Sequence, residues 1–233
     1  MKMRFLCLAA LMMAVMASAA NAAFVNSYDF DTDLSDTLGN GNDLTSSGGT
    51  VSGGRYSFSE NEGLELTSAL LDTSNYGIEM KLRSDDSVSG WNKLIDFEQL
   101  SSDSGLYVFE GDLFFWYLPS ANSPMISIGT DFIVGLERKA GIISVFLDGA
   151  LRYTAIDTLG EAVSSSNILN FLVDDTAITG EAFAGSVDWI RIHEDSSTFG
   201  QAPSAVPEPA SLAMWGLGAI GMMFARRKRQ QTN

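Results

Sequence analysis

The stretch IISVFLDGALRY, residues 142–153, indicates the fold class of this 233-residue chain. Two apolar-rich runs flank Asp148-Gly149, and an Asp-Gly pair readily adopts the positive φ angles of a tight hairpin turn. The stretch therefore predicts two antiparallel β-strands joined by a short turn.

Similar strand signals lie on both sides of this hairpin. The segment YGIEMKLR, residues 76–83, alternates apolar and polar residues, and VDWIRIH, residues 187–193, does so over its second half. Such alternation is typical of strands with one buried face. No stretch between the termini shows a sustained helical period, and about twelve short strands separated by Gly, Ser, Asn and Asp predict an all-β sandwich or jelly roll.

The amino terminus has the three regions of a secretory signal peptide. These regions are the basic Lys2 and Arg4, the apolar run 5–16, and small residues that end in Ala20-Asn21-Ala22. We expect export through the Sec machinery and cleavage after Ala22, with Ala20 and Ala22 as the small residues of the cleavage site. Cys7 is the only cysteine and lies inside this segment, so the mature chain cannot form a disulfide bond.

The carboxyl end, AVPEPASLAMWGLGAIGMMFARRKRQQTN, passes from two prolines to an uncharged apolar run, 210–225, and then to a basic cluster. As a helix, this run would be about 24 Å long, somewhat less than the roughly 30 Å of a bilayer's hydrocarbon core. Cations that follow it can reach the cytoplasmic interface and hold such a short span in place. We therefore expect one transmembrane segment at 210–225, with a plain tail anchor as the alternative role.

Both flanks of the apolar run carry a recognisable motif. The flanking residues are Val206-Pro207-Glu208-Pro209 before the run and Arg226-Arg227-Lys228-Arg229 after it. Together, over residues 206–230, they resemble the tripartite PEP-CTERM sorting signal of bacteria that make exopolysaccharide. The resemblance implies that an exosortase cleaves near Pro-Glu-Pro, that the inner membrane holds a transient intermediate, and that the body reaches the cell surface or extracellular matrix of a Gram-negative bacterium.

The body between the two signals, residues 23–205, has the length of one domain. We place this domain at 23–198 and a linker at 199–205. Without the basic residues of the two terminal signals and Glu208, the chain has eight basic and 28 acidic residues. This excess of negative charge argues against nucleic acid and anionic membrane surfaces as partners, and it favours either solubility outside the cell or binding of divalent cations.

Several turn-rich motifs of the body occur in a characteristic order. They are Tyr28-Asp29-Phe30-Asp31, Leu34-Ser35-Asp36, Gly39-Asn40-Gly41-Asn42-Asp43-Leu44, Val145-Phe146-Leu147-Asp148-Gly149 and the closing segment 185–192. Together they resemble the laminin-G-like, concanavalin A-like jelly roll. The resemblance implies that the first and last strands lie together, and that hydrolases on the same fold must be considered.

Aspartates are concentrated in the first predicted strand and the loop that follows it. They are Asp29, Asp31, Asp33, Asp36 and Asp43. Calcium prefers such carboxylate oxygens, and Asp188 could complete a site with Asp29 and Asp31 if the first and last strands meet. The alternative is that the aspartates end turns through hydrogen bonds to the backbone. Structural Ca²⁺ at Asp29, Asp31 and Asp188 is the one cofactor hypothesis.

The run LFFWYL, residues 113–118, is apolar at every position. A strand buried on both faces is the simplest interpretation. The functional alternative is that one face of a concave sheet carries exposed rings, Trp116 with Tyr107 or Trp91, on which the sugars of an exopolysaccharide stack.

Three glutamates are the candidates for catalysis. Laminarinase-type hydrolases place acids on alternate residues of one strand, and the closest approach to this pattern is Glu60, Glu62 and Glu65. Glu65 has the wrong parity, and Asn61 with Gly63 predicts a hairpin turn between strands at 56–58 and 64–66.

Histidine chemistry is equally restricted. His193 is the only histidine, which leaves no partners for a zinc site or a nucleophilic triad. We therefore expect a non-enzymatic module that binds carbohydrate or another surface partner, with a glycan-active hydrolase and a passive matrix component as alternatives.

Overall fold

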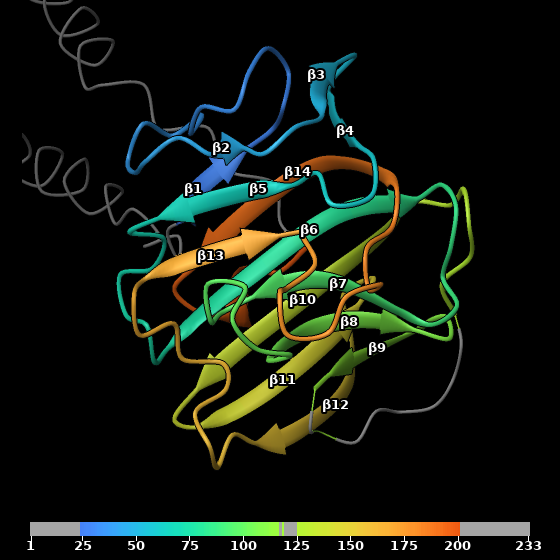
Figure 1. Ribbon diagram of the computed structural model, residues 1–233. Helices are drawn as coiled ribbons and strands as arrows, with labels where there is room; N and C mark the ends of the chain where they lie inside the picture. The colour runs from blue at the N-terminus through green and yellow to red at the C-terminus, as the bar shows by residue number, and fades with distance from the viewer. Residues whose placement is uncertain (1–23, 117, 119–124, 201–233) are drawn as a thin grey trace, which may run out of the picture. The chain divides into compact units, whose positions relative to one another are not determined.

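The computed structural model describes residues 24–116, 118 and 125–200 (Figure 1). The predicted signal peptide, the membrane segment 210–225 and the sorting signal 206–230 lie outside the described residues. Within the described ranges, no helix has the length and apolarity needed to cross a membrane.

The described chain forms two antiparallel sheets, which confirms the predicted all-β sandwich. Sheet A contains, in spatial order, β12 (Ala150–Ile156), β11 (Ile142–Leu147), β10 (Phe132–Lys139), β6 (Tyr76–Ser84), β14 (Gly185–His193), β4 (Arg55–Phe58) and β3 (Thr50–Ser52), with β1 (Phe24–Tyr28) also paired to β14. Sheet B contains β2 (Thr45–Ser46), β5 (Leu64–Thr67), β13 (Ile168–Phe171), β7 (Trp91–Asp96), β8 (Gly105–Phe109) and β9 (Asp112–Phe115). A short 3₁₀ helix, η1 (Ser196–Thr198), follows β14.

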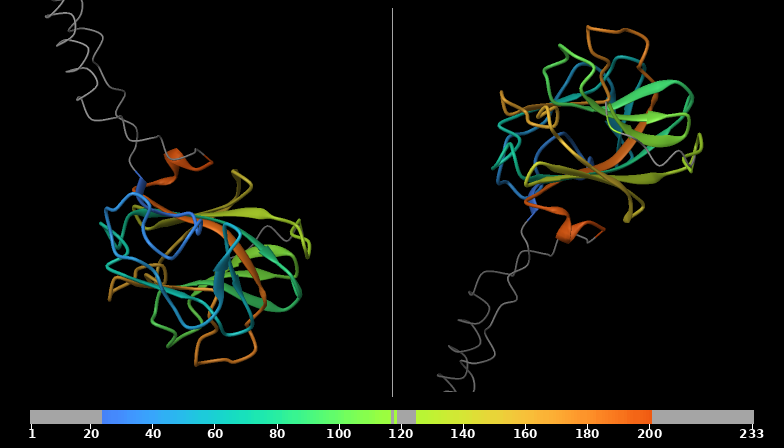
Figure 2. Two further views of the ribbon diagram at one scale, coloured as in Figure 1. Left: turned by 90° about the horizontal axis from the view of Figure 1, so that it is seen from above. Right: turned by 90° about the horizontal axis from the view of Figure 1, so that it is seen from below.

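The two sheets lie face to face as two layers, which are seen from above and below in Figure 2. The buried apolar side chains of both sheets form one core cluster between the layers. Since the described residues contain no cysteine, this burial of apolar surface is the main source of their stability.

The hairpin predicted at residues 142–153 is confirmed in detail. Leu147 of β11 pairs with Ala150 of β12, so the turn consists of Asp148 and Gly149 alone. Their φ angles are 49° and 76°, as a two-residue hairpin turn with two positive φ angles requires.

A β-bulge in β14 explains why apolar and polar residues alternate only in the second half of this strand. Val187 pairs with Leu82 and Trp189 with Lys81, so Asp188 is an extra residue that forms a β-bulge. Beyond the bulge, Ile190 and Ile192 are buried in the core.

The first and last strands are neighbours, as the jelly-roll resemblance implies. Strand β1 pairs antiparallel with β14, and Tyr28 lies opposite Ile190. In Figure 1, β1 lies beside β14.

The predicted hairpin around Asn61 and Gly63 is wrong. A turn does occur there, with Asn61 at a φ of 63°, but β4 belongs to sheet A and β5 to sheet B, so the segment crosses between the sheets. Phe58 and Leu64 at its two ends are both buried. If the chain stayed in one sheet, β4 and β5 would pair with each other. Because the chain crosses between the sheets instead, the two strands contribute side chains to the core from opposite layers.

The domain also continues into the segment that the sequence assigned to a linker. The Phe199 ring packs 5.3 Å from the Phe146 ring and 5.0 Å from that of His193. The backbone N–H of Gly200 donates to the Glu79 carboxylate at 2.8 Å. These contacts cover part of the outer surface of sheet A.

Candidate functional site

Strand β9 is buried on one face only, so the simplest interpretation of the run 113–118 is not confirmed. Leu113 and Phe115 are fully buried in the core. Phe114 and Trp116 lie on the other side and are partly exposed. The physical reason is that sheet A covers only one face of sheet B, so Phe114 and Trp116 on the outer face keep contact with solvent.

Four partly exposed rings form an aromatic face on the outer side of β7, β8 and β9. They are Trp91, Phe109, Phe114 and Trp116. The Trp91 ring is central: it stacks on Phe109 with 4.1 Å between ring centroids, and it meets Phe114 and Trp116 edge-on, each at 5.1 Å. Edge-on and offset-stacked pairs are the favoured aromatic geometries, so the rings hold one another in place.

Tyr107, the third residue predicted to stack on sugars, is buried beneath the aromatic face and contacts Trp91. Its side chain is only 1% exposed, and its ring meets Trp91 edge-on at 5.4 Å. The hydroxyl donates a 2.8 Å hydrogen bond to the main-chain oxygen of Asp103. The structure thus brings the three predicted residues together, with two rings partly exposed and one buried.

A pocket of about 240 Å³ lies beside Trp116. Its lining residues are Phe115, Trp116, Leu118, Asp157, Thr158, Leu159 and Glu161. Among them, Asp157 accepts a 2.8 Å ion-pair contact from Arg138, and Glu161 accepts a hydrogen bond from the Ser104 hydroxyl. The pocket therefore combines an indole ring with polar groups that can accept hydrogen bonds from a ligand.

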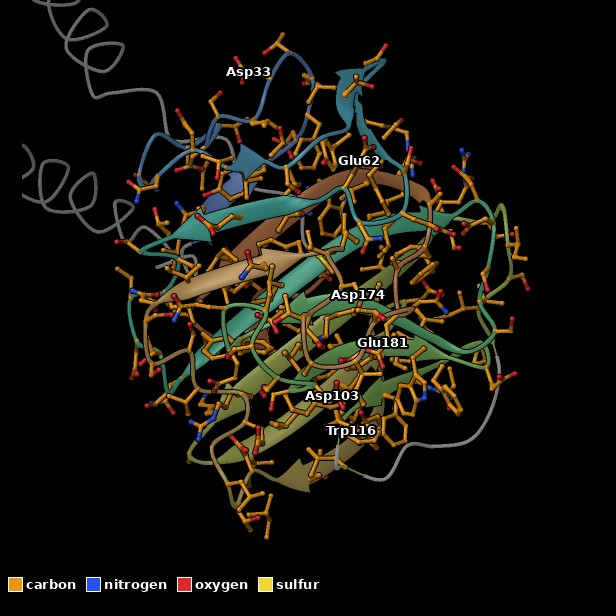
Figure 3. All side chains as sticks on the ribbon, in the orientation of Figure 1. Asp33, Glu62, Asp103, Trp116, Asp174 and Glu181 are labelled. Atoms are coloured by element: carbon orange, nitrogen blue, oxygen red, sulfur yellow. The ribbon has the colours of Figure 1, made fainter. Side chains whose placement is uncertain are left out.

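A second group of side chains, the acidic cluster, lies on the same sheet. It consists of Asp103 from the loop 97–104 and Asp174, Asp175 and Glu181 from the loop 172–184. One carboxylate oxygen from each of Asp103, Asp175 and Glu181 lies within 4.8 Å of the other two. Figure 3 labels Asp103, Asp174, Glu181 and Trp116 on the front of the molecule.

Lys93 provides a positive charge beside the acidic cluster. Its side chain is fully buried, and its ammonium contacts the carboxylate of Asp175, that of Asp96 at 3.5 Å, and the main-chain oxygen of Ser102 at 3.1 Å. The ammonium also lies 5.2 Å from the centre of the Tyr107 ring. Lys93 therefore links the acidic cluster to the residues that support the aromatic face.

Burial alters the protonation of this region. It raises the pKa of Glu181 from 4.5 to about 7; the neighbouring Asp103 carboxylate adds to the rise, whereas the Tyr107 hydroxyl and Lys93 oppose it. Burial also raises the pKa of Asp103, and the charge of Asp175 adds to that effect. Carboxylates gathered in a low-dielectric environment resist losing their last protons.

The three residues predicted to bind calcium do not lie in the acidic cluster, and two of them contact other side chains. Asp188 forms a 2.6 Å ion pair with Lys81 and lies 3.9 Å from Arg55. Asp29 accepts hydrogen bonds from the hydroxyls of Ser27 and Thr37. Asp31 is exposed. Among the residues that the structure describes, these carboxylates are not in the group close enough to share a metal ion. Calcium at this place stays a prediction.

Two further aspartates of the first loop end turns. Asp36 is 7% exposed and accepts four hydrogen bonds from backbone N–H groups and one from the Asn26 amide. Asp33 accepts from the backbone and hydroxyl of Ser35. This local role is the alternative that the sequence left open.

The residues considered for catalysis are dispersed or structural. Glu62 accepts a 2.7 Å hydrogen bond from the Ser59 backbone within the turn between the sheets, and Glu60 and Glu65 are exposed. His193 is 1% exposed and lies 2.5 Å from the Thr198 hydroxyl. Burial lowers its pKa to about 4.

The acidic cluster was not anticipated from the sequence. Asp174-Asp175 lies in the loop that follows β13, but about seventy positions separate it from Asp103. Only the pairing of β13 with β7, and of β7 with β8, brings the two loops together.

Solved structures similar to this one are β-sandwich domains. Domain 4 of AbnA, a GH43 extracellular arabinanase from Geobacillus stearothermophilus solved with arabinotriose, has a TM-score of 0.57 and 16% identity, covering 75% of this chain and 93% of that chain. Trypanosoma rangeli sialidase in complex with sialic acid has a TM-score of 0.59 and 11% identity over 75% of this chain, but only 31% of the sialidase is covered. Botulinum neurotoxin type C, in a study of its interaction with two ganglioside molecules, has a TM-score of 0.54 and 13% identity, with 74% and 48% covered. At these identities the likeness establishes the fold.

The carboxyl terminus gives a more specific result. The profile of the PEP-CTERM protein-sorting motif matches residues 205–229, which confirms the motif expected at 206–230. This motif implies export, a membrane-anchored sorting intermediate and processing by an exosortase. A search among curated proteins gave no significant match for the chain.

Proposed function

We propose that residues 24–200 form a carbohydrate-binding module that acts at the cell surface or in the extracellular matrix after the sorting signal has been cleaved. The observation that carries this proposal is the aromatic face on the outer side of β7, β8 and β9. Aromatic rings offer apolar area to the faces of sugar rings and lose little conformational entropy on binding.

The pocket beside Trp116 supports the same function. It lies at one end of the aromatic face, so a sugar that stacks on Trp116 can place its hydroxyl groups near Glu161 and Thr158. Polar groups of this kind fix the orientation of a ligand, whereas the rings supply most of the contact area. An exported polysaccharide fits both features and the sorting motif.

The fold comparisons agree with this proposal without specifying a ligand. The arabinanase domain was solved with arabinotriose, and the neurotoxin study concerns gangliosides. Both ligands contain sugars, and each belongs to the protein in which it was described. For this chain, the exopolysaccharide of the host is the first ligand to test.

The decisive experiment is a binding assay on immobilised polysaccharides, including the host's exopolysaccharide, arabinan, laminarin and alginate. We expect Trp116→Ala and Trp91→Ala to weaken binding about tenfold or more, the equivalent of about 1.4 kcal/mol. Trp189→Ala is the matched control, because Trp189 is also partly exposed but lies on sheet A, where Arg191 covers its ring at 3.9 Å.

Two outcomes would overturn the proposal. Absence of binding to every polysaccharide would favour a passive matrix component. An equal loss of binding in all three tryptophan variants would show that the aromatic face is not the binding site. A melting curve for each variant separates loss of the site from loss of the fold. Release of reducing sugar that disappears in the double variant Glu60→Gln, Glu62→Gln would instead establish a hydrolase.

A further inference from the structure

The acidic cluster holds more carboxyl groups than the one neighbouring ammonium can neutralise. Asp174, Asp175 and Glu181 are at most 8% exposed. With the nearby Asp103 they present four carboxyl groups, and the ammonium of Lys93 carries a single charge that it also shares with Asp96. Buried carboxylates are costly unless charges or hydrogen bonds compensate them.

Several oxygens of the cluster have no hydrogen-bond donor among the described residues. These atoms are Oδ1 of Asp103, Oδ1 of Asp174 and Oε2 of Glu181, each fully shielded by the surrounding protein. The other oxygen of Asp174 accepts from the backbone of Gly180 and Glu181, at 2.8 and 3.0 Å. Backbone contacts therefore fix the Asp174 carboxylate while its second oxygen stays available. A buried acceptor without a partner costs free energy, and a bound cation would remove that cost.

The ligand atoms define the kind of cation. They are all carboxylate oxygens, without a histidine nitrogen or a cysteine sulfur, which favours a hard ion over zinc or copper. The ligands come from two irregular loops, and calcium accepts six to eight oxygens in flexible geometry, whereas magnesium demands a near-ideal octahedron.

We propose that a calcium ion binds where the carboxylates of Asp103, Asp175 and Glu181 converge, beside Asp174, and fastens the loop 97–104 to the loop 172–184. This site is separate from the one predicted at Asp29, Asp31 and Asp188, because Asp188 lies on sheet A.

Calcium at this site would also support the aromatic face. The Tyr107 hydroxyl donates to the main-chain oxygen of Asp103, and the Tyr107 ring contacts Trp91. Fixing the position of Asp103 therefore limits the movement of Tyr107 and of the ring above it. The metal site itself does not depend on the proposed carbohydrate binding, because its ligands and its test are independent of any sugar.

The test uses the full-length protein, stripped of metal with a chelator and titrated with Ca²⁺ by calorimetry and by thermal melting. We expect saturable binding and a melting temperature that rises with calcium, with a much smaller effect of Mg²⁺. Tb³⁺ in place of Ca²⁺ should give luminescence sensitised by the nearby Tyr107 and Trp91.

Variants distinguish the two possible calcium sites. Glu181→Gln and Asp103→Asn should each weaken calcium binding at least tenfold, and Asp188→Asn should leave it unchanged. Asp103 is only partly buried, so its variant keeps the test valid if Glu181→Gln fails to fold. Calcium binding that is lost in Asp188→Asn but retained in Asp103→Asn and Glu181→Gln would overturn the proposal, as would a wild-type melting temperature that does not respond to calcium.

Discussion

Glu181 should make the stability of the metal-free protein depend on pH. Its carboxyl group has a pKa of about 7 in the folded protein against an ordinary value of 4.5, chiefly because it is buried. Below pH 4.5 the group is protonated in both the folded and the unfolded state. Between pH 4.5 and 7 the folded protein keeps a proton that the unfolded chain releases, so the free energy of unfolding falls as the pH rises.

The size of this effect follows from the two pKa values. A rise from 4.5 to about 7 corresponds to about 3 kcal/mol, lost by the time the pH exceeds 7. Because Asp103 and Asp175 interact with Glu181, the proton is shared by the acidic cluster, and this value is an upper bound for the single residue.

The perturbation that isolates this contribution is Glu181→Gln, which keeps the shape of the side chain and removes its charge. His193 has the opposite effect on the pH profile, because burial lowers its pKa to about 4 and its stabilising contribution is lost as the pH falls. The quantity to measure is therefore the difference between wild type and variant, in which His193 cancels.

The assay is urea unfolding followed by tryptophan fluorescence, in chelator, from pH 4.5 to 8. The variant should match the wild type near pH 4.5 and exceed it by up to about 3 kcal/mol at pH 8, a melting-temperature difference of roughly 6 to 12 °C. Asp188→Asn, on the other sheet, should not show this pH-dependent gain. A difference for Glu181→Gln that stays constant across the pH range would refute the argument from burial.

Three further predictions concern the first loop, the hairpin turn and processing. Asp36→Ala should destabilise the fold by about 3 kcal/mol in urea unfolding, since it leaves several backbone N–H groups without their acceptor. The exposed Asp33→Ala should cost clearly less; equal costs would contradict the role of Asp36. Gly149→Ala should cost about 1 kcal/mol, because its φ is 76° while no atom lies within 4 Å of the added Cβ, and a cost near zero would contradict the turn assignment. The intact mass of protein recovered from the surface of its native host should lack residues 1–22 and everything after about Pro209, and retention of the basic tail would favour a plain membrane anchor.

Local patterns in the sequence determined the fold class and the sorting motif. The Asp148-Gly149 turn and the alternation at 76–83 each depend on neighbouring residues, because turn geometry and the two-residue period of a strand are local properties. The sorting motif at 205–229 is likewise contiguous. Such features are visible in sequence without knowledge of which strands pair.

The aromatic face was partly predictable. Trp91, Tyr107 and Trp116 were identified by residue type, but their burial was not predictable from residue type alone. Tyr107 is buried where its hydroxyl reaches the main chain of Asp103, whereas Trp116 is partly exposed on the outer face of sheet B. Both facts depend on the order of strands in sheet B, which local periodicity does not specify.

The tertiary structure alone assembled the acidic cluster. Asp103 and Glu181 come from loops that only the pairing of β13, β7 and β8 brings together, and each looks like an ordinary loop residue in the sequence. The same dependence explains the error at Asn61, where a local turn signal was correct but the two strands joined different sheets. The sequence by itself determined the strands and turns, whereas the pairing of distant strands decided which side chains share a buried environment, because burial and charge interactions depend on distance in space.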